Sequence, residues 1–255
     1  MTRRDEYYNR AKQEGYRSRA AYKLRQLDDR ADLLPRGGTV VDLGAAPGGW
    51  LQVAAERVGD GGRVIGVDRQ RIRPLEDHDV ETVRGDMTDE GTRDRLREAV
   101  GEGGADAVLS DMAPNMTGEY EVDHARSVHL ARQALETALV VLAPGGDLAV
   151  KVFDGRDRAD LEADIDAEFD HVRTYRPDAS RDSSSELYLV AKGRMTAPVE
   201  PGDEFAVEIV DTGSEGDGVA KVDGYTLFVT DAEEGETVPV RVTEVKPRFG
   251  FAERR

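Results

Sequence analysis

Four side chains of this sequence could act together on a sugar hydroxyl. They are two lysines and two acids: Lys23, Asp111, Lys151 and Glu186. Lys151 lies in the apolar run 150–153, and an apolar setting disfavours the charged form of an amine. A neutral lysine can act as a base, and a ribose 2′-hydroxyl must lose a proton when it attacks a methyl group. From spacing alone other roles stay open, since Lys23 could be a surface charge, Glu186 an exposed strand end and Lys151 a snorkelling residue.

A glycine-rich turn and three acidic residues could bind a cationic nucleoside. The segment 42–50 (DLGAAPGGW) ends a β-branched run, and its small residues let the backbone pass close to a ligand. Each acid ends a later strand-like run: Asp68 suits a ribose diol, Asp86 an adenine amino group and Asp111 a sulfonium cation. The alternative is a structural turn with acids that cap helices. The spacing is not G-x-G-x-x-G, which disfavours an NAD-dependent oxidoreductase.

These residues need a sheet to bring them together, and the sequence predicts one. From residue 39, strand-like and helix-like runs alternate, which indicates parallel βαβ units and an α/β, Rossmann-like, doubly wound sheet. Strands are predicted at 39–43, 63–68, 80–86, 105–111 and 147–153, and helices at 50–58, 88–100 with Thr88 as N-cap, 121–142 and 156–169. The runs HVRTYRP and ELYLVAK, joined by ASRDSSS, predict a hairpin at one edge.

A second domain follows from the change of pattern near residue 195. Beyond it we find no helical periodicity, only short β-rich runs separated by glycine, which predict a small all-β barrel of the oligonucleotide-binding (OB-like) kind. We therefore expect a basic N-terminal segment over residues 1–36, an α/β domain over 37–193, a linker over 194–200 and the barrel over 201–255.

The charge of the chain gives conflicting indications about nucleic acid. The net charge is −17, from 35 basic and 52 acidic residues, whereas phosphate contacts depend on Lys and Arg. Acids spread along the whole chain suit a salt-rich cytosol, where high ionic strength screens self-repulsion, although an ordinary acidic protein is the alternative. Residues 1–25 are the exception, with eight basic and three acidic residues among four tyrosines. This segment suits phosphate contacts and base stacking, or forms a helix with a solvated basic face.

Other composition features exclude several classes of protein. The 255 residues contain no cysteine and four scattered histidines, so we expect neither disulfides nor a metal site. No run is long and apolar enough for a membrane span or a secretory signal. We therefore expect a cytoplasmic protein with no membrane partner.

Seven short motifs occur in an order that is known from one enzyme family. They are SRAAYKL (18–24), VVDLGAAPGGWLQVA (40–54), GVD (66–68), GD (85–86), SDMAPNMTG (110–118), VKVF (150–153) and SSSELYLVAKG (183–193). Together they resemble the FtsJ/RrmJ-type ribose methyltransferases over roughly residues 1–193. The resemblance implies transfer of a methyl group from S-adenosyl-L-methionine to a ribose 2′-hydroxyl of RNA.

The resemblance also assigns residues. The family's catalytic Lys-Asp-Lys-Glu tetrad falls on Lys23, Asp111, Lys151 and Glu186, with Lys151 as proton acceptor. Its cofactor contacts fall on Gly48, Trp50, Asp68, Asp86 and Asp111. It implies no metal, and it makes residues 1–36 a segment that contacts RNA.

The C-terminal runs GDGVAKVDGYTLFV and GETVPVRVTEVKPRFGFAE resemble a TRAM domain, a barrel found on RNA-modifying enzymes. Its net charge is negative, but its last stretch is locally basic and contains Phe249 and Phe251, which suit base stacking. The implied substrate is a uridine of large-subunit ribosomal RNA, with the large ribosomal subunit as partner.

Three alternatives remain from the sequence. The first is 2′-O-methylation of transfer RNA, and the second is a non-catalytic RNA-binding assembly factor that merely keeps a cofactor pocket. The third is methylation of a base amino group, which SDMAPN (110–115) disfavours because it departs from the acidic-Pro-Pro-aromatic signature of that class.

Overall fold

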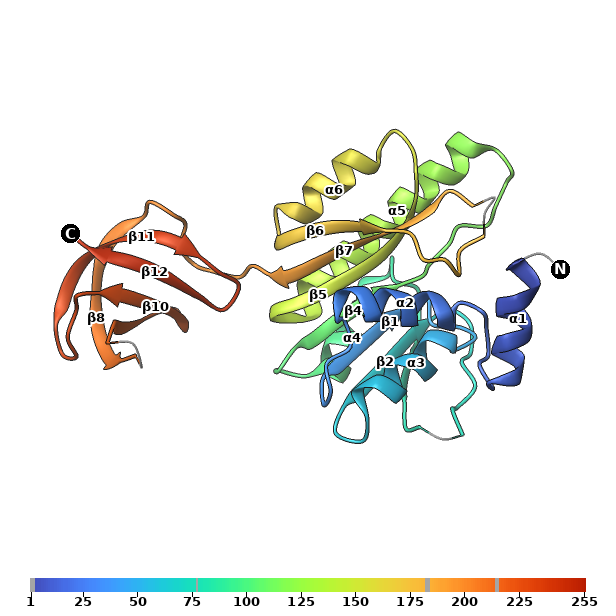
Figure 1. Cartoon of the computed structure of the whole chain (residues 1–255), viewed down its shortest axis with the longest axis horizontal. Coiled ribbons are helices and arrows are strands. Elements are labelled where there is room, and N and C mark those ends of the chain that lie inside the picture. Colours follow the sequence, from blue (N-terminus) through green and yellow to red (C-terminus); the bar gives the residue numbers. More distant parts are fainter. Residues whose placement is uncertain (1–2, 77, 182–183, 214–215) are drawn as a thin grey trace. The chain divides into compact units, whose positions relative to one another are not determined.

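The chain is described by a computed structural model that covers residues 3–76, 78–181, 184–213 and 216–255 (Figure 1). Asp182 and Ser183, which belong to the predicted loop and to the start of the last motif, lie outside the described residues. The chain divides into two compact units, Met1–Lys192 and Gly193–Arg255. Each unit has its own hydrophobic core.

The first unit is built on a seven-stranded sheet. Its strands are β1 (Thr39–Leu43), β2 (Arg63–Asp68), β3 (Glu81–Arg84), β4 (Ala105–Ser110), β5 (Leu142–Phe153), β6 (Phe169–Tyr175) and β7 (Glu186–Arg194). Their order is β3-β2-β1-β4-β5-β7-β6. Strands β1 to β5 pair in parallel, and β7 pairs antiparallel with β5. The predicted doubly wound sheet is confirmed, and the last two strands lie beside each other at one edge as expected.

Six helices accompany the sheet among the described residues of this unit. They are α1 (Arg3–Gln13), α2 (Ala21–Ala31), α3 (Gly49–Val58), α4 (Glu90–Val100), α5 (Tyr120–Val141) and α6 (Arg158–Asp166). Successive residues of a strand point to opposite faces. Val40 of β1 therefore packs with Leu24 of α2 and Leu51 of α3, whereas Val41 packs with Leu135 of α5. The sheet is thus covered on both faces, by α2 and α3 on one and by α4, α5 and α6 on the other.

The predicted N-cap of the fourth helix was wrong. The helix begins at Glu90, and its N-cap is Asp89, whose carboxylate accepts a hydrogen bond from the Thr92 amide. Thr88 is used elsewhere, because its amide and hydroxyl both donate to Asp86 Oδ1. Thr88 therefore does not cap the helix, because it already donates both hydrogen bonds to Asp86.

Some predicted boundaries also move. The helix expected over 156–169 covers only Arg158–Asp166, because Phe169 is buried and already begins β6. Strand β5 begins at Leu142, directly after α5, rather than at residue 147. Its pairing with β4 is irregular between Ala105 and Ala107, where the extra residues before Asp147 are accommodated.

The second unit is a closed five-stranded barrel, as predicted. Its strands are β8 (Glu204–Thr212), β9 (Gly218–Val222), β10 (Tyr225–Thr230), β11 (Thr237–Val245) and β12 (Phe249–Arg254), in the order β10-β12-β11-β8-β9. Alternation along the strands fills the interior with small and branched side chains such as Ile209, Leu227 and Val240. Over the described parts of both units, no helix combines the length and the apolar character that a membrane crossing requires.

Candidate active site

The carboxyl ends of β1, β2 and β4 meet at one edge of the sheet, because these strands are parallel neighbours. A cavity of about 770 Å³ opens at this edge. Asp68, Asp86 and Asp111, the three acids that were predicted to end strands, all line it, together with Gly44. Met87, Met112 and Leu130 add apolar walls, so the cavity combines carboxylates with an apolar surface.

The glycine-rich turn forms the inner rim of this cavity. Gly44 has φ +78°, and a Cβ there would lie 2.6 Å from Cγ of Met112. Both the backbone conformation and the close approach therefore require glycine at this position. The turn is tied to β2, because the Ala46 amide donates to Asp68 Oδ2 over 2.9 Å. The other oxygen of Asp68 accepts from the Gln70 amide at 2.7 Å, so this carboxylate is held in place from two sides.

Asp86 presents an ionised carboxylate to the cavity. Hydrogen bonds from the Thr88 amide, and then from the Thr88 hydroxyl, hold the pKa of Asp86 below its ordinary value. Its second oxygen lies 3.3 Å from Nε of Arg69. This acid can therefore accept a hydrogen bond from a ligand at neutral pH.

The four residues of the predicted tetrad lie together beside the cavity. Nζ of Lys151 is 2.8 Å from Oδ1 and 2.5 Å from the backbone oxygen of Asp111. Nζ of Lys23 is 2.7 Å from Oε1 of Glu186 and 4.0 Å from Oδ1 of Asp111. Lys23, Lys151 and Glu186 are each less than a tenth exposed. The arrangement is a buried cluster of two lysines and two acids.

Strand pairing explains this convergence. β5 and β7 run antiparallel with Lys151 opposite Tyr188 and Phe153 opposite Glu186. Residues that pair directly, and residues two apart on one strand, share a face of the sheet. Lys151, Glu186 and Tyr188 therefore all point to the face that α2 covers, and Lys23 reaches them from that helix.

Tyr188 is a site residue that the sequence reasoning missed. Its hydroxyl donates to Asp111 Oδ1 over 2.6 Å, and its side chain is fully buried. Burial first, and then the charges of Asp111 and Glu186, raise the pKa of Tyr188 well above its ordinary value, so it stays a hydrogen-bond donor. The signal was available, because Tyr188 follows Glu186 at the period of two that places both side chains on one face.

The electrostatics of the cluster centre on Asp111. Burial alone would raise the pKa of Asp111, but Lys151 and Lys23, together with the hydrogen bonds from Lys151 and Tyr188, hold it below its ordinary value. Asp111 is therefore an anion at neutral pH. The surroundings of Lys151 are not apolar throughout, as the sequence predicted, because the Asp111 carboxylate contacts its amine directly.

A second cavity, of about 430 Å³, lies on the other side of the tetrad. Lys23, Lys151 and Glu186 line it, and so do Arg19 and Arg181. The first cavity touches Asp111, whereas this one touches Lys151, and Ala113 lines both. The Asp111–Lys151 ion pair thus stands between a cavity with acidic walls and a cavity with two arginines.

Two residues that the resemblance assigned to the cofactor do not line the first cavity. The Trp50 side chain is 3% exposed, donates from Nε1 to the Ala20 oxygen over 2.8 Å and packs beside the Tyr188 ring. It therefore joins α3 to α2. Gly48 is the N-cap of α3, and a Cβ at this position would lie 2.9 Å from the Arg17 guanidinium. Any contact of these residues with a cofactor would come from the backbone at the start of α3.

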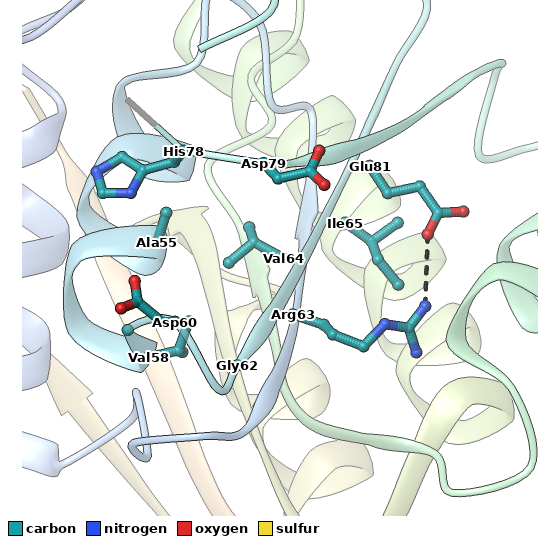
Figure 2. A pocket seen from close by; sticks show the side chains of 11 residues that line it. Ala55, Val58, Asp60, Gly62, Arg63, Val64, Ile65, His78, Asp79 and Glu81 are labelled. Atoms are coloured by element: carbon teal, nitrogen blue, oxygen red, sulfur yellow. Dashed lines mark hydrogen bonds and ion pairs between the residues drawn. The ribbon is translucent and has the colours of Figure 1, made fainter. Parts of the chain in front are cut away.

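A further cavity, of about 570 Å³, lies at the opposite end of β2 (Figure 2). Val58, Asp60 and His78 line it, and the ion pair between Arg63 and Glu81, 3.4 Å long, forms one side. None of the predicted site residues reaches it. Within the described residues, no group of three or more His, Asp or Glu side chains could hold a metal ion.

A doubly wound sheet with an antiparallel strand inserted beside its edge, and a ligand cavity at the carboxyl ends of its central strands, defines a methyltransferase of the Rossmann-like class. Residues 16–194 match the profile of the FtsJ-like methyltransferases, and residues 198–254 match the TRAM domain. The chain belongs to the FtsJ-like methyltransferase family.

Two named relatives align with nearly the whole length of this chain. A Natronomonas pharaonis protein named "Ribosomal RNA large subunit methyltransferase E" is 71% identical over 253 residues, which are 99% of each chain. A Methanosarcina mazei protein of the same name is 49% identical over 98% of this chain and 92% of its own. A Plasmodium falciparum crystal structure, provisionally described as a ribosomal RNA methyltransferase, superposes with a TM-score of 0.64 at 29% identity. It covers 70% of this chain and 98% of its own.

Proposed function

We propose that this protein transfers a methyl group from S-adenosyl-L-methionine to a ribose 2′-hydroxyl of a uridine in large-subunit ribosomal RNA. The observation that supports this most is the buried Asp111–Lys151 pair between the two cavities. This pair supports the proposal because a potential base would then lie at the boundary between a site for a cationic donor and a site for an anionic acceptor. The names of the relatives indicate the kind of RNA. Ribosomal RNA as substrate also implies a place in the cytoplasm.

The donor site fits S-adenosyl-L-methionine on the chemistry of its walls. Three carboxylates outnumber the one arginine of the wall, Arg69, which is itself paired with Asp86, so the walls suit a cationic nucleoside and would repel a diphosphate. Asp68 would hold the ribose, Asp86 the adenine amino group and Asp111 the charged end, with the backbone at Gly48 and Trp50 beside them. The bound donor supplies an electrophilic methyl group.

The second cavity would hold the acceptor nucleotide. Arg19 and Arg181 at its wall can contact the phosphates that flank the ribose, and Arg19, Ala20 and Lys23 of this wall belong to the basic segment 1–36. We propose that Lys151, which lines this cavity, acts as an uncharged amine and accepts the proton of the 2′-hydroxyl, so that it becomes an ammonium beside Asp111. Asp111 and Tyr188 keep the amine in position, and Glu186 holds Lys23 beside them. Fixing the hydroxyl against the methyl group should supply much of the acceleration.

The decisive experiment is methylation in vitro with labelled S-adenosyl-L-methionine, using archaeal ribosomal subunits and bulk transfer RNA in parallel. Label should enter large-subunit RNA, and mapping should find a 2′-O-methyluridine. Label on transfer RNA alone would show that transfer RNA is the substrate, and label on a base would refute methylation of the ribose. If S-adenosyl-L-methionine binds but no RNA is labelled, the protein is a binding factor rather than an enzyme.

A further inference from the structure

The proposed reaction leaves one buried acid of the sheet, Asp42, without a role. Asp42 lies in β1, and its side chain is 1% exposed. Its Oδ2 has no hydrogen-bond partner among the described residues. A buried polar atom without a partner costs free energy, so its presence needs an explanation. Gly44, two residues further along, lines the first cavity, which places Asp42 close to the proposed donor site.

Strand register puts Asp42 between two carboxylates of that cavity. Asp42 pairs with Gly66 of β2 and with Leu109 of β4. Asp68 and Asp111 follow these partners by two residues and therefore point to the same face of the sheet. A rise of about 3.3 Å per residue and a strand spacing of about 4.8 Å put each of their Cα atoms about 8 Å from that of Asp42. The three acids thus form one group on three neighbouring strands.

The members of this group differ in exposure and in charge. Asp68 and Asp111 line the cavity, whereas Asp42 is buried. Burial first, and then the charges of Asp111 and Asp68, raise the pKa of Asp42 well above its ordinary value. The pKa of Asp111, in contrast, lies below its ordinary value. Asp42 therefore keeps its proton at pH values at which Asp111 is an anion.

No protein cation pairs with Asp42 in the described parts of the chain. The other titratable groups on this face contact one another: Lys23, Lys151, Glu186 and Tyr188, with Asp111 between them. Helix α3, which covers the same face, adds apolar side chains such as Leu51. A cation that enters the cavity between Asp68 and Asp111 would therefore supply the positive charge that Asp42 lacks.

We propose that Asp42 favours the cationic methyl donor over its neutral product, because it gives up its proton when the donor binds and recovers one after the methyl group has left. The inference rests on the proposed function in taking S-adenosyl-L-methionine as the donor. A sulfonium beside Asp111 offsets the repulsion among the three acids, so that Asp42 can ionise and pass its proton to the solvent. Methyl transfer leaves an uncharged thioether, and Asp42 then takes a proton back from the solvent. Asp42 thus acts on specificity through its charge.

The test counts the protons that the full-length protein releases on binding a ligand, by calorimetry in buffers of different ionisation enthalpy between about pH 5 and about pH 9. Binding of S-adenosyl-L-methionine should release up to about one proton from Asp42, and its affinity should rise with pH over the same interval. Sinefungin, in which an amine replaces the sulfonium, should behave in the same way. S-Adenosyl-L-homocysteine, which is neutral at sulfur, should release fewer protons.

Asp42→Asn is the informative variant, because asparagine has nearly the shape of a protonated carboxyl group and does not titrate. Its proton release should be smaller than that of wild type. Its preference for S-adenosyl-L-methionine over S-adenosyl-L-homocysteine should fall about tenfold at the upper end of the pH range, since charges about 8 Å apart interact strongly enough inside a protein for that factor.

Two further variants show where the proton comes from. The effect of Asp42→Asn should persist when Lys151 is replaced by alanine, because the proton does not come from the amine. Asp60→Asn removes a carboxylate at the opposite end of β2, in the cavity of Figure 2, and is the matched control. It should release protons and prefer the donor as wild type does.

Three results would overturn the inference: unchanged proton release in Asp42→Asn, equal release with donor and product in wild type, and an Asp42→Asn variant that keeps the full preference for the donor. The second result needs no variant, so the inference can be tested even if Asp42→Asn does not fold. Failure to bind S-adenosyl-L-methionine would refute the proposed function itself. Donor binding with the expected proton release would support the inference even if no RNA were methylated.

Discussion

At the scale of single residues, Asp111 connects the parts of the site. Its carboxylate lies within hydrogen-bonding distance of both Lys151 and Tyr188, and Lys23 is 4.0 Å away. Its position at the end of β4 gives it access to the donor cavity. One residue can therefore contribute to binding the donor and to holding the proposed base.

Removing the proposed base should separate binding from chemistry. We expect Lys151→Ala to lower the rate of methyl transfer about 10²- to 10⁴-fold, because that is the usual contribution of a general base. The affinity for S-adenosyl-L-methionine, measured by calorimetry, should stay within a few-fold of wild type, since Lys151 lines the second cavity and not the first. Single-turnover transfer near the wild-type rate would remove Lys151 from the mechanism.

Asp42 should make the stability of the protein depend on pH. Its side chain is 1% exposed, and its Oδ2 has no hydrogen-bond partner among the described residues. Burial first, and then the charges of Asp111 and Asp68, raise the pKa of Asp42 well above its ordinary value. The folded protein thus keeps a proton that the unfolded chain releases above about pH 4, so the contribution of Asp42 to stability is fully present below that pH and is lost as pH rises.

The comparison with Asp42→Asn isolates this effect, because asparagine does not titrate. Relative to wild type, the variant should gain free energy of unfolding as pH rises from about 4 towards neutrality, by up to about 1.4 kcal/mol per pH unit. Denaturant unfolding of both proteins at several pH values measures the difference. Parallel pH profiles for the two proteins would contradict the assignment of a buried, protonated Asp42.

At the scale of elements, one arginine, Arg17, joins three segments near the first cavity, which we propose binds the methyl donor. The Arg17 guanidinium donates to the backbone oxygens of Pro47, Arg73 and Pro74 at 3.2, 2.5 and 2.5 Å. It thereby ties the segment before α2 to the glycine-rich turn and to the loop after β2. The same guanidinium occupies the space that a Cβ at Gly48 would need.

We expect Arg17→Ala to loosen the glycine-rich turn and to weaken donor binding about tenfold, because hydrogen bonds from a charged group are worth about 1.5–3 kcal/mol. Arg97→Ala is the matched control, since this arginine is exposed on α4 and forms a local ion pair with Asp94. Calorimetry with S-adenosyl-L-methionine measures both variants. Equal affinity of Arg17→Ala and wild type would show that the turn holds its shape without this link.

The helices and strands were predictable to the extent that their signals are local. Periodicity and glycine punctuation predicted the strands of the sheet and the all-β character of the second unit, and the acids at strand ends followed from them. Boundaries failed where a side chain had a competing partner, as when Asp86 engaged Thr88 and Asp89 became the N-cap. Trp50 lies in the motif 40–54 that resembles the family, yet its indole nitrogen donates to the Ala20 oxygen directly before α2. The sequence could not predict this contact, because the position of α2 on the sheet depends on contacts between distant segments.

At the scale of the whole molecule, net charge decides the response to salt. The chain carries −17, and several of its similar relatives come from halophilic archaea. Self-repulsion among the acids should destabilise the fold in dilute buffer, and salt screens it, with a Debye length of about 10 Å at 0.1 M and about 3 Å at 1 M. The folded state should therefore need salt.

Accordingly, both the melting temperature and the rate of methyl transfer should rise as KCl increases from about 0.1 M to above 1 M. Differential scanning fluorimetry and the labelled-donor assay over a KCl series measure the two quantities. A control series with sorbitol at matched osmolality separates screening of charge from a general effect of solutes. Activity that falls steadily into molar KCl would contradict the high-salt interpretation.

The order of the elements, the division into an α/β sheet and a barrel, and the carboxylates at the ends of the parallel strands were all predictable from the amino-acid sequence. These features depend on neighbours in the chain, through periodicity, turn residues and the geometry of βαβ units. Which charges meet depends on the tertiary structure. Lys23 of α2 reaches Glu186 of β7, and Tyr188 reaches Asp111, because strand register and helix packing bring distant segments together. It also showed that Phe228 joins Phe249 and Phe251, since strands β10 and β12 become neighbours only when the barrel closes.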